Sequence, residues 1–203
     1  MRLGVPLLVM MGVPAWGAFC SPNSSSAELR HDFQFFAGFS PASVTLIGTT
    51  SDRRLLLAGF GYSYRCWTWS GTAVSYSGEI LPAAILFEPG QYLPPFVPAH
   101  SVYGFGVTPL GFTAEFGLRH KVYPFLQTNE GIVASSEPIP INVTGATGLN
   151  FLIDVGGGIR VKAGARHAIS FGYKFLHISN GFTSAVNPGV DNNVFYAGFS
   201  ILR

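Results

Sequence analysis

One segment near the end of the chain, residues 166–179, alternates between two kinds of side chain. Successive side chains of a β-strand point to opposite faces, so this alternation predicts a strand with one largely aromatic face. That face carries His167, Ile169, Phe171, Tyr173, Phe175, His177 and Ser179. The other face places Lys174 among small, polar and aliphatic residues. Such a strand needs two different surroundings, one for each face.

The composition indicates that one of these surroundings is lipid. Charged residues make up 11% of the 203 residues, whereas hydrophobic residues make up 48%, and ordinary globular chains carry about 25% charge. No internal apolar run approaches the roughly 18 residues that a membrane helix needs. The remaining way to satisfy every backbone amide within lipid is a closed β-barrel.

Short alternating segments separated by Gly, Pro, Asn and Ser recur along the chain, which is typical of an all-β fold. We therefore predict an eight-stranded antiparallel transmembrane β-barrel, with Asp154, Arg160 and Lys174 in its lumen. A soluble lipid-binding barrel would have the opposite polarity. The residues 87–99 and 130–148 are predicted to be loops. The predicted strands are 32–39, 54–64, 72–81, 102–116, 121–128, 150–161, 166–179 and 193–202.

The N-terminus has the features of a secretory signal peptide. Arg2 precedes an apolar core at residues 3–13, and Ala15-Trp16-Gly17 forms a small-x-small cleavage site. We predict a signal peptide at 1–17, a flexible lead-in at 18–31 and the barrel domain at 32–203, exported to a Gram-negative outer membrane. Cys20 and Cys66 could pair in an oxidising compartment or remain two free thiols.

Chemically useful side chains gather at the end of the segment 166–179. His177 and Ser179 share a face, which places a possible base beside a possible nucleophile. A hairpin centred near Ser184 would bring Asp191 directly across from His177. The alternative is that these residues are only the polar end of a strand entering a turn.

Other classes of site find little support in the sequence. A net charge of +2 without a Lys/Arg run argues against nucleic acid as a partner. Gly156-Gly157-Gly158 lies within a strand pattern and lacks the Lys-Ser/Thr of a phosphate-binding loop. The remaining histidines lack metal-ligand spacing. We predict no metal and no organic cofactor.

The closing third of the chain resembles the outer-membrane lipid A 3-O-deacylase family (PagL type). The resemblance rests on Gly148-Leu149-Asn150-Phe151, Gly156-Gly157-Gly158, His177-x-Ser179-Asn180 and Asn187-Pro188-Gly189-Val190-Asp191, which occur in family order. It implies an eight-stranded barrel with a Ser-His-acid triad on its lipid-facing wall. It also implies a carboxylic ester hydrolase that removes the acyl chain at position 3 of lipid A.

The same resemblance implies roles for four residues. Ser179 matches the nucleophile, His177 the general base and Asn180 the residue associated with the oxyanion hole. Asp191 stands at the place of the triad acid, where the family carries glutamate. The implied partners are lipid A or lipopolysaccharide as substrate and the surrounding outer-membrane lipid, and the oligomeric state stays open.

Two other functions remain possible at the level of sequence. One is a catalytically silent outer-membrane barrel with a structural or adhesion role, and the other is an outer-membrane phospholipase. Ester hydrolysis that depends on Ser179 distinguishes the silent barrel from the enzymes. The identity of the lipid that loses an acyl chain distinguishes the two enzymes.

Overall fold

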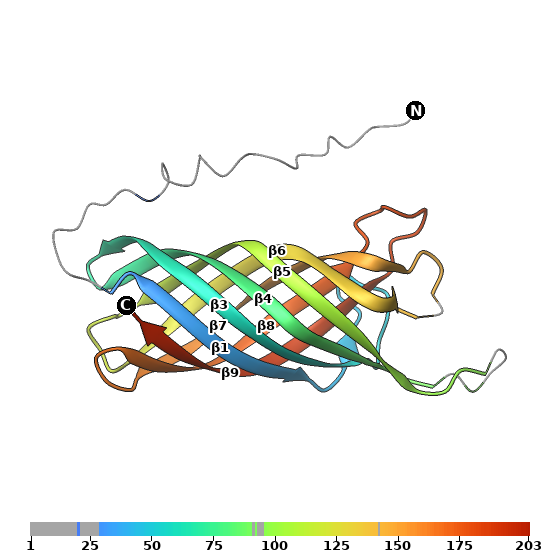
Figure 1. The fold of residues 1–203 in the computed structure, drawn as a ribbon, viewed down its shortest axis with the longest axis horizontal. Coiled ribbons are helices and arrows are strands. Elements are labelled where there is room, and N and C mark those ends of the chain that lie inside the picture. Colours follow the sequence, from blue (N-terminus) through green and yellow to red (C-terminus); the bar gives the residue numbers. More distant parts are fainter. Residues whose placement is uncertain (1–19, 21–28, 91, 93–95, 142) are drawn as a thin grey trace, which may run out of the picture.

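The computed structural model describes residue 20 and residues 29–90, 92, 96–141 and 143–203 (Figure 1). The predicted signal peptide at 1–17 lies outside the described residues, as does most of the predicted lead-in. No helix in the described part of the chain is long and apolar enough to cross a membrane. The strands are β1 (His31–Ser40), β2 (Ser43–Val44), β3 (Arg54–Trp69), β4 (Thr72–Glu88), β5 (His100–Phe116), β6 (Val122–Ile139), β7 (Thr147–Lys162), β8 (His167–Ser179) and β9 (Gly189–Leu202).

Eight long strands form a closed antiparallel barrel, as the alternation predicted. Each strand from β3 to β8 pairs with the next in the chain, and β1 closes the ring by pairing with both β3 and β9. Phe35, for example, lies opposite Phe60 on one side and Phe199 on the other. The short β2 pairs with β9 beyond the end of β1. Every predicted strand has a counterpart in this barrel.

The predicted loop at 130–148 is wrong at both ends, because β6 continues to Ile139 and β7 begins at Thr147. The predicted loop at 87–99 is wrong at its first two residues, because β4 continues to Glu88. Neighbouring strands hold residues 130–139 in the sheet. Ile132 lies opposite Val107 of β5 and Phe151 of β7. Gly131 permits the close approach of β6 to β5, since a Cβ at this position would collide with the carbonyl oxygen of Val107. The barrel is therefore taller than the sequence pattern indicated.

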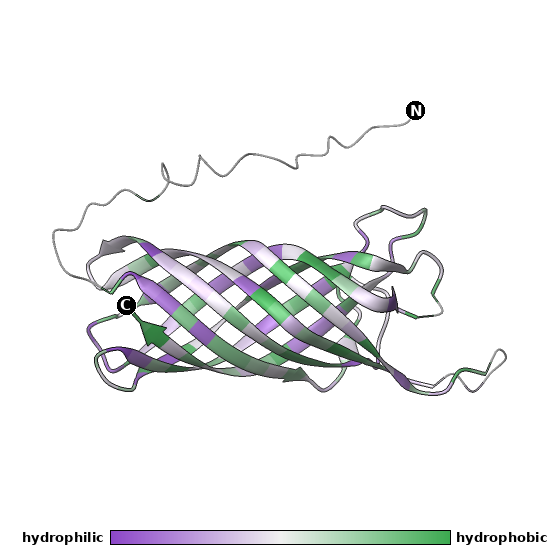
Figure 2. Cartoon of the chain, viewed as in Figure 1, coloured by the Kyte–Doolittle hydropathy of each residue, from purple (hydrophilic) through white to green (hydrophobic). Residues whose placement is uncertain are grey.

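The two faces of the wall differ as predicted, and Figure 2 shows hydrophilic and hydrophobic residues alternating along the strands. In β8 the side chain of Phe171 is 53% exposed on the outside, and Ile169 and Tyr173 share that face. Ser170 and Lys174 are buried inside. The outward aromatic face is thus ready to contact lipid.

Buried ion pairs fill one part of the lumen. Lys174 Nζ donates to both carboxylate oxygens of Glu79, at 3.0 and 2.9 Å, and to Asp154 Oδ2 at 3.2 Å. Arg160 Nη1 donates to Asp32 Oδ2 at 2.6 Å and to Glu115 Oε1 at 2.7 Å. The predicted lumen positions of Asp154, Arg160 and Lys174 are confirmed. Their pairing offsets the cost of removing charges from water.

Aliphatic side chains fill another part of the interior, which the sequence analysis did not predict. Because eight strands enclose a space just wide enough for side chains, apolar residues can close it without leaving a channel. Ile178 and Val190 belong to this cluster, next in the chain to His177 and Asp191. The cluster also contains Leu55, Leu57, Leu86, Val102, Val133, Leu152 and Leu176.

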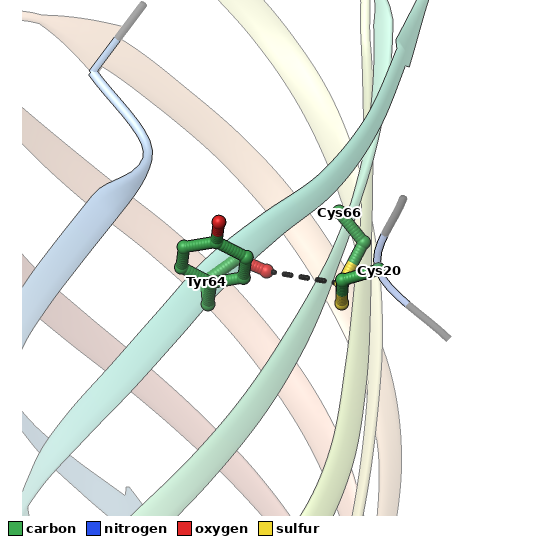
Figure 3. Close-up of a disulfide and its surroundings, with 3 residues drawn as sticks. All are labelled: Cys20, Tyr64 and Cys66. Atoms are coloured by element: carbon green, nitrogen blue, oxygen red, sulfur yellow. Dashed lines mark hydrogen bonds between the residues drawn. A yellow bond between two sulfur atoms is a disulfide. The ribbon is translucent and has the colours of Figure 1, made fainter. Parts of the chain in front are cut away.

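A disulfide joins Cys20 to Cys66 of β3 (Figure 3). The two alternatives left open by the sequence are thereby resolved in favour of pairing. Cys66 Sγ also lies 3.5 Å from the carbonyl oxygen of Tyr64. The bond ties the chain before β1 to the wall of the barrel.

The outward face generates a prediction about membrane assembly. Phe171→Arg should lower the fraction of protein that folds into lipid vesicles, because a lipid-facing arginine near the membrane midplane costs about 2–4 kcal/mol. Ala165→Arg adds the same side chain in an exposed turn and should fold like the wild type. Gel mobility of unheated samples measures the folded fraction. Equal folding of both variants would contradict the assignment of the faces.

The buried ion pairs generate a prediction about stability. Lys174→Met leaves the carboxylates of Glu79 and Asp154 without their cation, so it should destabilise the barrel by about 3–5 kcal/mol. Lys121→Met removes an exposed lysine and serves as the matched control. Denaturant unfolding in detergent micelles measures the difference. A stability loss no larger than that of the control would show that Lys174 does not compensate these charges.

Candidate active site

The predicted triad residues lie together where β8 ends and β9 begins. The register places His177 directly opposite Asp191 and Ser179 opposite Gly189, which confirms the predicted cross-strand pairing. Their neighbours Ile178 and Val190 point into the apolar cluster. Because side chains alternate along a strand, His177, Ser179 and Asp191 lie on the outer side of the wall. In Figure 1 this end of the barrel is opposite the C-terminus.

A short hydrogen bond joins the imidazole to the carboxylate. His177 Nδ1 lies 2.5 Å from Asp191 Oδ1, with the imidazole 12% exposed and the carboxylate fully buried. A carboxylate at Nδ1 favours the tautomer that carries its proton there, which leaves Nε2 free to accept one. Gly189 makes room for the ring, since a Cβ there would lie 2.7 Å from His177 Cε1.

The second oxygen of Asp191 is held by three consecutive backbone amides. Asp191 Oδ2 accepts hydrogen bonds from the N–H groups of Leu46 at 2.9 Å, Ile47 at 2.6 Å and Gly48 at 2.8 Å. Hydrogen bonds to a carboxylate favour its charged form and offset its burial. The sequence analysis missed these donors because they are backbone groups, which have no side-chain signature.

Ser179 lies beside this pair at the end of β8 and is 7% exposed. Among the described residues, the Ser179 hydroxyl makes no hydrogen bond to His177. Hydrogen bonds between a nucleophile and its base are often long before substrate binds. On the neighbouring β7, Phe151 lies opposite Ser179 and Ile153 opposite His177. Both side chains are outward and exposed, so they form an apolar border to the site.

Asn180 has a different immediate environment from that expected of an oxyanion donor. Its side-chain Nδ2 donates to the carbonyl oxygens of Gly145 at 2.7 Å and Val186 at 2.8 Å, and its Oδ1 accepts from the Phe182 amide at 2.8 Å. The side chain thus stabilises the loop between β8 and β9 and links it to the turn between β6 and β7. The oxyanion role of Asn180 stays a prediction, and it would use the backbone N–H.

The remaining histidines do not join this site. His31, His100, His120 and His167 lie elsewhere in the barrel and its turns. Among the described residues, no group of three or more His, Cys, Asp or Glu side chains could hold a metal ion. The side chains that the site does bring together are a hydroxyl, an imidazole and a carboxylate, which are the groups of acyl-transfer sites.

Residues 57–200 match the family described as "Lipid A 3-O-deacylase (PagL)". The chain belongs to the PagL family. This match covers seven of the eight long strands, from β3 to β9, and includes His177, Ser179, Asn180 and Asp191. Membership of this family places the chain among the outer-membrane ester hydrolases that act on lipid A. No curated protein gives a significant match.

Solved structures show the same barrel fold in other outer-membrane proteins. The crystal structure of the outer membrane enzyme PagL matches with a TM-score of 0.58 and 17% identity, covering 84% of this chain and 98% of that one. Neisserial surface protein A matches with 0.53 and 11% identity, covering 84% and 96%. The outer membrane protein OprG from Pseudomonas aeruginosa matches with 0.51 and 11%, covering 87% and 97%. At these identities the likeness concerns the fold.

The hydrogen bonds of Asp191 generate a prediction for this PagL-family chain. In Asp191→Asn, the side-chain oxygen would accept from the three amides, so the new NH₂ group would face His177 Nδ1. That contact favours the imidazole tautomer with its proton on Nε2, which cannot accept the serine proton. Esterase kcat should fall by about 10⁴-fold, as expected when a triad base has the wrong tautomer.

The matched control is Glu137→Gln, because Glu137 is an exposed carboxylate on β6 that pairs with His100, away from the site. Steady-state kinetics on the folded proteins measures both variants. Wild-type kcat in Asp191→Asn would mean that the carboxylate does not orient His177.

Proposed function

We propose that this protein is an outer-membrane esterase that removes the 3-O-linked acyl chain of lipid A through Ser179, His177 and Asp191. One observation carries the proposal: in a chain of the PagL family, the 2.5 Å bond between His177 and Asp191 lies on the outer wall of the barrel. Ser179 lies two residues further along the same face. The ester hydrolysis named for the family thus agrees with the chemistry that these three side chains can perform.

The proposed chemistry proceeds by acyl transfer. His177 Nε2 accepts the proton of Ser179 as the serine oxygen attacks the ester carbonyl, and Asp191 stabilises the resulting imidazolium. The backbone N–H of Asn180 is proposed to stabilise the oxyanion, a contribution worth about 3 kcal/mol in comparable hydrolases. The sugar hydroxyl leaves with the proton from His177. Water then releases the fatty acid by the same steps, and no cofactor enters.

The position of the site suits a substrate that stays in the membrane. Phe151 and Ile153 border it on the outer wall, so an acyl chain can lie against the barrel while its ester reaches Ser179. The segments 89–99 and 180–188 at this end are longer than the turns 70–71 and 163–166 at the other. Outer-membrane barrels have long extracellular loops and short periplasmic turns. We therefore propose that the site faces the outer leaflet, where lipopolysaccharide resides.

Export through the predicted signal peptide belongs to the same proposal. A peptide that is removed after residue 17 would leave Cys20 near the mature N-terminus, where it forms the disulfide with Cys66. Disulfides form and persist in oxidising compartments such as the periplasm. The disulfide therefore supports passage through that compartment.

Mass spectrometry of lipid A tests the proposed activity. Lipid A from cells that express the wild type should lose one ester-linked hydroxyacyl chain at position 3 and keep its amide-linked chains. Ser179→Ala and His177→Ala should each abolish the loss, and the double variant should be little worse because the two residues act as a unit. Ser184→Ala removes a hydroxyl from the adjacent loop and should retain the activity.

Three outcomes would contradict the proposal. Unchanged lipid A in cells with folded wild-type protein would favour a silent barrel. Loss of fatty acid from phospholipids instead of lipid A would indicate a phospholipase. Full activity in Ser179→Ala would exclude this serine as the nucleophile.

A further inference from the structure

The segment 43–53, between β1 and β3, packs against the first residues of β9. Its first residues form β2, in which Val44 lies opposite Asp191. Further along, the Thr49 and Thr50 amides donate to the carbonyl oxygen of Gly189 at 3.0 and 3.3 Å. The Thr50 hydroxyl donates to the same oxygen at 2.8 Å. The segment therefore contacts β9 at Asp191 and again at Gly189, two residues away.

A close backbone approach brings the amide donors to the carboxylate. A Cβ at Gly48 would collide with the carbonyl group of Gly189, so a larger residue would push the segment away. The side chains of Leu46 and Ile47 remain exposed while their amides turn toward Asp191. The groups that this segment presents to the Asp191 carboxylate are thus backbone amides.

A buried ion pair anchors the other end of the segment. Arg53 Nε donates to Glu88 Oε2 at 2.8 Å, and Glu88 Oε1 accepts from the Ile141 amide at 3.2 Å. Glu88 is buried at the end of β4, so it links the segment to β4 and to the β6–β7 turn. The Arg53 amide donates to Ser43 Oγ at 3.0 Å, and this hydroxyl donates to the Thr50 carbonyl at 3.1 Å. These bonds close the segment into a defined loop.

We propose that the segment 43–53 is a positioning element of the hydrolytic site, in which Arg53 and Glu88 hold three backbone amides against Asp191. The inference rests on the proposed esterase function. One oxygen of Asp191 is held by the amides, so the other stays directed at His177 Nδ1. Residues from the first loop of the barrel therefore determine the orientation of a base on β8, the seventh long strand.

Removal of one amide donor tests the inference directly. Ile47→Pro deletes the N–H that lies 2.6 Å from Asp191 Oδ2, and we expect kcat for lipid A in mixed micelles to fall by about 10- to 100-fold, since small displacements of catalytic groups have effects of this size. The KM should change little. Ile47→Ala keeps the N–H and should lose far less activity. Tyr92→Pro places a proline in another exposed loop and controls for a general effect of proline.

Removal of the anchor provides a second test that leaves the backbone intact. Arg53→Met should lower kcat in the same way, and Arg53→Lys should restore part of it through a new ion pair with Glu88. Arg54→Met is the matched control, because the neighbouring Arg54 is exposed and its guanidinium lies over the ring of Phe87. Gel mobility of unheated samples verifies that each barrel is folded. If Ile47→Pro does not fold, Arg53→Met carries the test.

The deciding measurement repeats these substitutions in an Asp191→Ala background. If the segment acts through the carboxylate, Ile47→Pro and Arg53→Met should cause no further loss there, because coupled residues are not additive. Wild-type kcat in both variants, or the same fold-loss with and without Asp191, would overturn the inference. A folded wild type without Ser179-dependent product would instead overturn the proposed function.

Discussion

The antiparallel pairing of β1 with β9 closes the sheet, and the other features of the barrel depend on that closure. An open edge would expose unpaired N–H and C=O groups to lipid, at a cost of several kcal/mol for each group. Closure at eight strands also limits the width of the lumen. Charged side chains inside must then pair with groups of opposite charge. Lys174 pairs with Asp154, and Arg160 pairs with Glu115. Aliphatic side chains close the remaining interior.

The pairing along β9 is interrupted near the site, between the part that pairs with β1 and the part that pairs with β2. Pairing of β1 with β9 ends at Phe39 and Phe195, and β2 resumes it at Ser43 and Asn192. The chain then folds over the start of β9 instead of continuing as a regular strand. This departure supplies hydrogen-bond donors to Asp191, which would otherwise be a charged group on an apolar wall. An irregular connection thus makes a buried carboxylate tolerable on the outside of a barrel.

The aspartate at position 191 fits this geometry. The resemblance to the deacylase family implies glutamate at this place, and aspartate is shorter by one methylene. Direct cross-strand register brings its carboxylate within 2.5 Å of His177 without that extra length. The second oxygen is already occupied by the amides of the segment 43–53. The short side chain and the close loop are therefore mutually compatible.

The sequence by itself determined the barrel and the neighbourhood of His177, Ser179 and Asp191. Alternation along a strand is a local property that shows which side chains share a face, and a hairpin between adjacent strands then sets their register. The tertiary structure alone decided that residues 130–139 join β6, that Cys20 pairs with Cys66 and that three amides hold Asp191. These features depend on contacts between segments far apart in the chain. Backbone donors contribute to them without a side-chain pattern, so the sequence carries no local signal for where they meet.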